Sequence, residues 1–288
     1  MDQLALILIS GVASGTVYGL IGLGIVIIFR ATDVVNFSIG TVSVFGMYVA
    51  AAAVPAIGLP LAMLVGLAVS VGIGLGIREA FIRPLGQGRQ FAALVITLGI
   101  SLAFEAIIQM IWGGQPRPFP TLFPGTFRLG DSFIAYQQIF TIAIAAVAVV
   151  LVSLLFLRTP LGTAMRASAE SASTARLLGI RPQTTARIAW ALGAALSGIG
   201  IALHLGAVGL APAVIAPIIF RALAGILLGG LTSMTGAVVG GLVIGVLDNV
   251  AAAYVSASLR DTFVFSVAIL VLLIRPQGLF GRRTFQRV

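Results

Sequence analysis

The sequence predicts an all-α polytopic membrane protein, a helical bundle of about eight to ten spans with one short cytoplasmic helical loop. The 288 residues are 59% hydrophobic and 9% charged, with a mean hydropathy of +1.15. Soluble domains carry about 25% charged residues, so a soluble fold of this length could not bury so much apolar surface. We therefore expect one membrane domain over residues 1–288, with no separate soluble domain.

Nine apolar segments meet or approach the length of about 20 residues that a helix needs to cross the bilayer. They are 4–29, 38–56, 60–77, 91–112, 137–157, 188–208, 216–230, 236–255 and 262–274. The segments 216–230 and 262–274 are short, so they could be tilted or only partly inserted. The first segment lacks a basic leader and follows the acidic Asp2, which favours a retained span over a cleaved signal.

The distribution of arginines predicts the orientation of the chain. If the N-terminus is outside and nine spans alternate, the inner loops hold thirteen arginines: Arg30, Arg78, Arg83, Arg89, Arg158, Arg166, Arg176, Arg181, Arg187, Arg275, Arg282, Arg283 and Arg287. The outer loops hold only Arg117, Arg128 and Arg260. Because cytoplasmic loops are enriched in basic residues, the C-terminus and the segment 158–187 are expected in the cytoplasm. The net charge of +9 is explained in this way and does not indicate a nucleic-acid partner.

The residue types exclude several chemistries. All basic residues are arginine, so the chain lacks the lysine that a P-loop uses to hold nucleotide phosphates. It has no cysteine and only one histidine, His204, which favours a packing role over metal binding. Because we find no metal-ligand cluster and no nucleophile–base pair, we expect no catalytic residues and no metal site in this chain.

Glycines at four-residue spacing predict close helix packing. Such small-xxx-small faces let helix backbones approach each other in lipid. The glycine pairs and triplet with this spacing are Gly11, Gly15 and Gly19; Gly72 and Gly76; Gly225 and Gly229; Gly236 and Gly240; and Gly241 and Gly245.

The longest polar interruption, 158–187, is expected to fold as a short helical hairpin. Thr159 and Pro160 suit the N-cap and first position of a helix over 161–178. Gly179 suits its C-cap, and Pro182 prevents continuation. The apolar residues of this loop are too few to form a core, so the loop either docks on another protein or lies on the lipid headgroups.

Three charged residues fall within predicted spans, where charges are costly and often functional. They are Glu105, Arg221 and Asp248. We expect Arg221 and Asp248 to pair across adjacent helices, either as a structural ion pair or beside a substrate path. In the segment 35–41, VNFSIGT, Asn36 and Ser38 could face a passing polar solute from a helix end, or could simply cap that helix.

Four blocks of the chain resemble the bacterial ABC-importer permeases for branched-chain amino acids. They are GTVYGLIGLGIVIIFRATDVVNFSIGTVSVFGMY at 15–48, TPLGTAMRASAESASTARLLGI at 159–180, GILLGGLTSMTGAVVGGLVIGVLDNVAAAY at 225–254 and LLIRPQGLFG at 272–281. They occur in the order and spacing of that family and extend over nearly the whole chain. Together they resemble the smaller, LivH-type permease.

The resemblance implies that the loop 158–187 couples the permease to a separate ATPase. It implies coupling positions at Arg166, Glu170, Arg176 and Gly179, and it agrees with the absence of lysine. The implied partners are a second, LivM-like permease, two ATP-binding subunits that use ATP and Mg, and an extracytoplasmic substrate-binding protein. This chain would bind no cofactor itself. The outer segment 113–132 would help to receive the binding protein, or is a plain connector.

One departure from the family leaves the substrate open. Where the family pattern has a histidine and an acidic residue, this chain has Ile39 and Thr41. The alternatives are therefore an ABC permease for urea, an amide, a small organic acid or a sugar, or a stand-alone transporter or channel. A stand-alone transporter would need carboxylates inside the spans for ion coupling, and only Glu105 and Asp248 lie well inside them.

Overall fold

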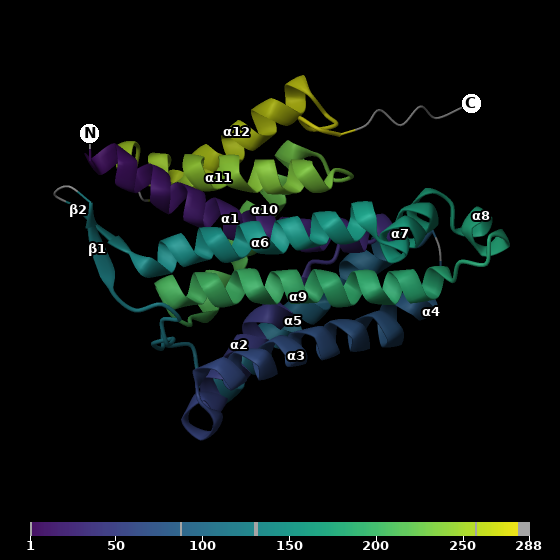
Figure 1. The fold of residues 1–288 in the computed structure, drawn as a ribbon, viewed down its shortest axis with the longest axis horizontal. Coiled ribbons are helices and arrows are strands. Elements are labelled where there is room, and N and C mark those ends of the chain that lie inside the picture. The colour runs from purple at the N-terminus through teal and green to yellow at the C-terminus, as the bar shows by residue number, and fades with distance from the viewer. Residues whose placement is uncertain (1, 87, 130–131, 257, 282–288) are drawn as a thin grey trace.

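The computed structural model describes residues 2–86, 88–129, 132–256 and 258–281, and it is a bundle of long helices that run side by side (Figure 1). The helices are α1 (Asp2–Thr32), α2 (Ser38–Ile57), α3 (Leu59–Ile77), α4 (Arg83–Leu85), α5 (Gln90–Trp112), α6 (Tyr136–Arg158), α7 (Pro160–Glu170), α8 (Ala172–Leu177), α9 (Pro182–Val208), α10 (Ile215–Gly229), α11 (Met234–Tyr254) and α12 (Arg260–Ile274). A π-helical turn, η1 (Arg78–Ile82), joins α3 to α4, and a 3₁₀ turn, η2 (Pro212–Val214), precedes α10.

Seven helical segments of the described chain are long and apolar enough to cross a membrane, and each coincides with an expected span. They comprise α1, α2, α3 with its extension to Leu85, α5, α6, α9 and α11. The two segments that the sequence marked as short are α10 and α12, with 15 residues each. At 1.5 Å per residue each reaches roughly 22 Å, less than the hydrocarbon thickness of about 30 Å.

Helix α1 is the centre of the bundle, packed against α9 and α11. Its glycines make the close approach that the sequence predicted: a Cβ at Gly15 would lie 2.7 Å from the Cα of Leu242 on α11. Gly225 and Gly229 of α10 similarly oppose Gly240 and Gly236 of α11.

The prediction for Gly72 and Gly76 was wrong, since a Cβ at either position meets nothing within 4 Å. The same spacing therefore occurs on a face of α3 that this chain leaves open. Four-residue spacing records that two glycines share a helix face but does not show that another helix lies there.

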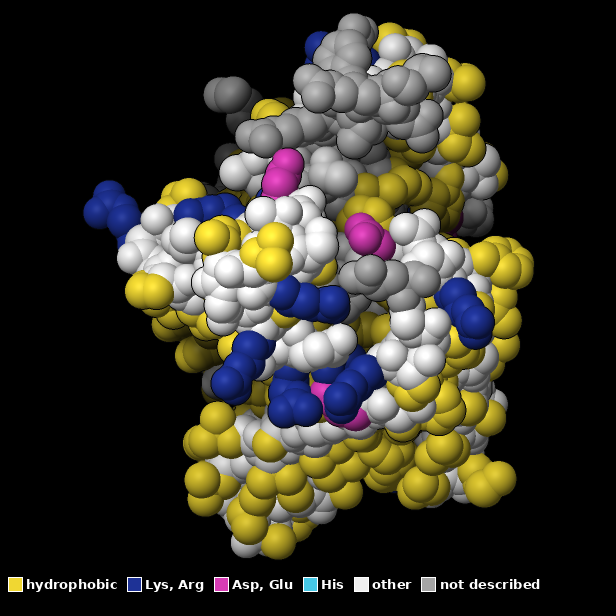
Figure 2. Space-filling model, turned by 90° about the vertical axis from the view of Figure 1, so that its right-hand side faces the viewer, with side chains coloured by type: hydrophobic (Ala, Val, Ile, Leu, Met, Phe, Trp, Pro, Cys, Tyr) yellow, Lys and Arg dark blue, Asp and Glu magenta, His cyan; other side chains and the backbone are white. Residues whose placement is uncertain are grey.

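The two ends of the bundle differ. One end carries the N-terminus and the strands β1 (Thr126–Leu129) and β2 (Ser132–Ala135), and the other carries α4, α7 and α8 (Figure 1). Arginines gather on the second end, which Figure 2 shows face on. Arg282, Arg283 and Arg287 of the predicted inner set lie outside the described residues.

The segment 113–132 is non-helical in its described part, as predicted. It leads into the antiparallel pair β1–β2, in which Thr126 faces Ala135. Arg117 and Leu210 exchange two backbone hydrogen bonds of 2.7 and 2.9 Å, which fasten the segment to the chain that follows α9.

Candidate functional site

The loop between α6 and α9 folds as two short helices in place of the single predicted helix over 161–178. Thr159 is the N-cap of α7, as expected, with its Oγ1 accepting a 3.1 Å bond from Gly162 N. The chain then breaks at Ser171, which is extended and caps α8 by accepting a 3.2 Å bond from Thr174 N. A serine that can cap a new helix competes with continuation of the old one, which explains the break.

Gly179 ends α8 in the way that the sequence predicted. It has φ +80°, a conformation that favours glycine. Ile180 N donates to Ala175 O at 3.0 Å and Gly179 N donates to Arg176 O at 3.0 Å, the bond pattern of a Schellman motif. The turn leaves Leu177 and Leu178 88% and 73% exposed at the tip of the loop.

Helix α7 fastens this loop rigidly to the bundle. Gly162 lies against the backbone of Leu155 and Phe156, where a Cβ would collide. Met165 is buried, so it is an internal anchor and does not offer apolar surface to another protein. Arg166 is partly buried, donates to Thr163 Oγ1 at 3.3 Å and leaves its Nη1 buried without a partner. Helix α7 is therefore packed on the spans, and α8 follows it at the exposed tip of the loop.

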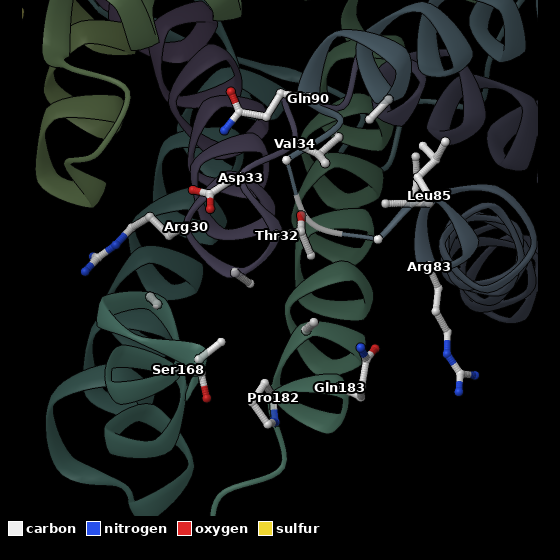
Figure 3. Close-up of a pocket in the computed structure, with 18 of the residues that line it drawn as sticks. Arg30, Thr32, Asp33, Val34, Arg83, Leu85, Gln90, Ser168, Pro182 and Gln183 are labelled. Atoms are coloured by element: carbon white, nitrogen blue, oxygen red, sulfur yellow. The ribbon is translucent and has the colours of Figure 1, made fainter. Parts of the chain in front are cut away.

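A cavity of about 640 Å³ lies between this loop and the ends of the spans (Figure 3). Of the predicted coupling residues, Glu170 and Arg176 line it, whereas Arg166 and Gly179 do not. The walls come from the end of α1, from η1 and α4, from the start of α5 and from the start of α9. Its charged lining residues are Arg30, Asp33, Arg78, Arg83, Arg89, Glu170 and Arg176.

Glu79, which the sequence analysis did not single out, joins η1 to the start of α9. Its carboxylate forms ion pairs with Arg78, with Arg83 at 3.0 Å and with Arg187 at 3.0 Å. The buried Arg78 also donates to the side chain and backbone oxygens of Gln183, at 2.8 and 3.0 Å. The residues just after α8 are thus held to the end of α3. Charge alternation in REAFIRP was the available signal, but sequence spacing could not reveal the contact with Arg187.

Inside the bundle, Arg221 and Asp248 pair as predicted. Arg221 Nε lies 3.2 Å from Asp248 Oδ1, and both side chains are about 95% buried. The contact is an ion pair without hydrogen-bond geometry, because Oδ1 accepts no hydrogen bond. The other carboxylate oxygen, Oδ2, accepts a 3.4 Å bond from the Tyr18 hydroxyl.

The Nη1 of Arg221 donates to the Tyr18 hydroxyl at 3.5 Å, and the other hydrogen bonds of Arg221 go to a residue that the sequence analysis missed. Its Nε and Nη2 donate to Asp261 Oδ1 at the start of α12, at 3.0 and 2.5 Å. Arg260 Nε completes the cluster, 3.6 Å from Asp248 Oδ1. Four charges therefore balance across α10, α11 and α12, beside Tyr18 of α1 and the neighbouring ring of His204. Among the described residues no group of three His, Asp or Glu side chains is placed to bind a metal.

Asn36 and Ser38 are buried at the start of α2, where they bond to each other. Asn36 Oδ1 accepts from Ser38 N at 2.9 Å and from Ser38 Oγ at 2.7 Å. Asn36 thus satisfies the first backbone N–H of α2 from the position before the N-cap residue Phe37, and the expectation that the pair faces a passing solute stays a prediction. Phe37 N donates to Thr97 Oγ1 on α5 at 3.4 Å, and Thr97 lies roughly 10 Å along α5 from its first residue. Helix α2 therefore begins inside the bundle.

Glu105 stands apart from both clusters. It is partly exposed on α5, and its side chain makes no hydrogen bond or ion pair with the rest of the described chain. The structure thus brings Arg221 and Asp248 together, brings Asn36 and Ser38 together, and leaves Glu105 without a partner.

Comparison with known proteins identifies the family. The family described as "Branched-chain amino acid transport system / permease component" matches residues 7–274. The chain belongs to this family. It is 30% identical to the high-affinity branched-chain amino acid transport permease BraD of Pseudomonas aeruginosa, over 98% of this chain and 97% of that protein. It is also 30% identical to LivH of Escherichia coli K12, over 97% and 96%.

More distant relatives agree with this membership. A probable branched-chain amino acid transport permease, LivH of Methanocaldococcus jannaschii, is 28% identical over 91% of this chain and 88% of its own length. Among solved structures, PsaBC from Streptococcus pneumoniae in complex with Fab aligns with a TM-score of 0.52 at 16% identity, over 95% of this chain and 92% of that chain. That likeness supports the fold of this permease family member.

Proposed function

We propose that this chain is the LivH-type translocation subunit of an ABC importer and carries branched-chain or similar amino acids across the cytoplasmic membrane of a bacterium. It forms half of the path, and a second, LivM-like permease forms the other half. Two separate subunits bind and hydrolyse ATP with Mg, and an extracytoplasmic binding protein delivers the substrate. The full-length similarity to BraD and LivH supports the class of substrate.

The single observation that carries the coupling role is the exposed apolar tip of α8 on a rigid base. Leu177 and Leu178 project from the loop, while Gly162 and Met165 fix α7 to the spans. Two neighbouring leucines exposed among polar residues suit insertion into an apolar groove of another protein. The ion pair between Arg187 and Glu79 of η1 then links the start of α9, which follows the loop, to the end of α3. Closure of the ATPases would pull on α8 and shift α3 and α9 together.

The arginine-rich end supports a cytoplasmic location for α7, α8 and the C-terminus, with the N-terminus and the β1–β2 pair outside. With this orientation, 113–132 faces the binding protein and the loop 158–187 faces the ATPases. With this orientation the charged cluster of Arg221, Asp248, Arg260 and Asp261 would lie nearer the outer side, because α11 ends and α12 begins toward the end of the bundle that carries the N-terminus (Figure 1).

Co-purification tests the proposal. The tagged chain is extracted from its native membranes in mild detergent, and the accompanying proteins are identified by mass spectrometry. We expect an ATPase and a second permease with the wild type, and loss of the ATPase with Leu178→Asp, because a charge in an apolar groove is costly. Thr184→Asp is the matched control, since Thr184 is exposed at the same end but belongs to α9 and not to the apolar tip formed by Leu177 and Leu178. Retention of the ATPase by Leu178→Asp, or its equal loss from Thr184→Asp, would contradict a coupling role for α8.

A further inference from the structure

Helix α5 carries a polar stripe that the proposed function does not yet use. Thr97, Ser101, Glu105 and Gln109 follow one another at four-residue spacing in a helix that is otherwise apolar. Side chains four residues apart lie on the same side of a helix, and the stripe turns by only about 40° at each step. The four residues therefore form one continuous polar line along much of the span.

The hydroxyl groups of the inner half of the stripe, Thr97 and Ser101, form hydrogen bonds within this chain. Thr97 Oγ1 accepts from Phe37 N and donates to Leu94 O at 3.0 Å. Ser101 Oγ shares a 2.6 Å hydrogen bond with Thr41 Oγ1 on α2. Helix α2 thus covers the stripe from the α4 end of the bundle up to Ser101.

The outer half has no such cover. The side chains of Glu105 and Gln109 make no hydrogen bond or ion pair within the described residues. Glu105 lies seven positions before the C-terminal residue Trp112, roughly 10 Å from the helix end, so its carboxylate sits at membrane depth. A carboxylate there is costly against lipid and normally faces a protein partner or a water-filled cavity.

The rest of α5 presents an apolar, exposed surface of the kind that faces lipid. Only 17% of its span is buried in this chain, and Leu102 and Met110 are 67% and 86% exposed. Glu105 lies between the α2 contact and this apolar face, whereas Gln109, seven positions after Leu102, lies on the exposed side of the helix. A protein wall opposite Glu105 at this depth would have to come from another membrane chain.

We propose that the α5 stripe lines a polar, water-containing path whose opposite wall is the second permease subunit. This inference rests on the proposed function and names the face through which the two permeases meet. The uncovered Glu105 and Gln109 supply carboxylate and amide groups along the path, beyond the Thr41–Ser101 pair at which the cover by α2 ends. These groups suit a solute with an ammonium and a carboxylate group, such as a free amino acid.

Site-specific crosslinking tests the stripe, and the natural absence of cysteine makes each introduced thiol unique within this chain. Gln109→Cys and the neighbouring Met110→Cys are each labelled with a thiol-reactive photo-crosslinker in the assembled transporter in native membranes. We expect the label at position 109 to crosslink to a permease chain and the label at position 110 to crosslink to lipid. Crosslinks from position 109 to lipid alone would overturn the inference.

Labelling with a membrane-impermeant maleimide provides a second measurement on the same variants. Since the thiolate is the reacting species and does not form in hydrocarbon, position 109 should react about ten-fold faster or more than position 110. Equal rates would count against a water-containing path. If an ATPase co-purifies while position 109 contacts only lipid, the stripe inference fails and the importer function stands. If position 109 contacts a permease but no ATPase co-purifies, the stripe inference stands and the importer function fails.

Discussion

Arg221 on α10 lies between two carboxylates, with Nε 3.2 Å from Asp248 Oδ1 on α11 and 3.0 Å from Asp261 Oδ1 on α12. One guanidinium therefore joins three helices, two of which are too short to cross the membrane by themselves. Arginine suits this role because its planar fork of donors serves two acceptors at once. The position of the short helices depends on this cation.

Removal of one member of the buried pair should be costly. Among the described side chains, Asp248→Asn leaves Arg221 with the half-exposed Asp261 as its anionic neighbour, and Arg221→Met leaves Asp248 with the more distant Arg260 as its cationic neighbour. The Tyr18 hydroxyl stays as a hydrogen-bond partner in both variants. Loss of one partner of a buried ion pair costs about 3–5 kcal/mol, so each variant should lower the thermal midpoint in detergent sharply.

The double variant Arg221→Met with Asp248→Leu removes both charges and should be more stable than either single variant. A double variant no more stable than the worse single variant would show that the two residues do not interact. A charge swap is a weaker test, because it places like charges next to Asp261 and Arg260.

The contact between α1 and α11 predicts a steep cost for any side chain at Gly15. A Cβ there lies 2.7 Å from the backbone of Leu242, so Gly15→Val forces the helices apart, at about 1–3 kcal/mol or more. Gly72→Val is the control, since nothing lies within 4 Å of a Cβ at Gly72. Thermal unfolding of the two purified variants should separate them, and equal midpoints would contradict the packing of α1 on α11.

Because Glu79 forms several ion pairs, we expect that removal of its side chain lowers transport more than removal of the side chain of its exposed partner Arg83. Glu79→Ala leaves Arg78, which is 3% exposed, without its carboxylate and frees Arg187 from η1. Arg83→Ala removes only an ion pair of a 54% exposed side chain, which is worth about 0–1 kcal/mol. We expect substrate uptake to fall at least several-fold for Glu79→Ala and little for Arg83→Ala. Similar uptake in the two variants would argue against a link between the loop and α3.

The turn at Gly179 provides a test of loop geometry. With φ +80°, substitution by a β-branched residue is strained by about 1–2 kcal/mol. Nothing lies within 4 Å of the added Cβ, so Gly179→Val should disturb the turn without disturbing the bundle. ATP hydrolysis by the assembled complex should lose its stimulation by substrate, whereas the thermal midpoint of the isolated permease should not change. An unaffected ATPase response would show that the turn is not needed.

The sequence predicted the spans well because burial in lipid leaves a strong hydropathy signal at every position of a helix. It also found Arg221 and Asp248, because charges inside apolar runs are conspicuous. It did not find Asp261, which lies just outside a predicted span and reaches back to Arg221. The sequence analysis also missed the break at Ser171. Helix propensity favoured one continuous helix, but the capping hydrogen bond from Thr174 N to Ser171 Oγ stabilises the start of a second helix.

Contacts between residues that are far apart in the sequence could not be predicted from sequence spacing alone. Glu79 pairs with Arg187 across 108 positions, and only the fold places them together. Gly72 and Gly76 have the same spacing as Gly11 and Gly15, yet one pair faces open space and the other packs on α11. The partner subunit proposed at α5 would leave its trace in the described chain as polar side chains without a bonding partner, those of Glu105 and Gln109.

The most direct test of the central claim is uptake of radiolabelled leucine into membrane vesicles that contain the complete transporter, with and without ATP on the cytoplasmic side. The account predicts uptake that requires ATP, is abolished by Leu178→Asp and persists with Thr184→Asp at equal permease levels. Uptake that proceeds without ATP, or that is unaffected by Leu178→Asp, would show that the chain works as a self-sufficient transporter and would contradict the coupling role of α8.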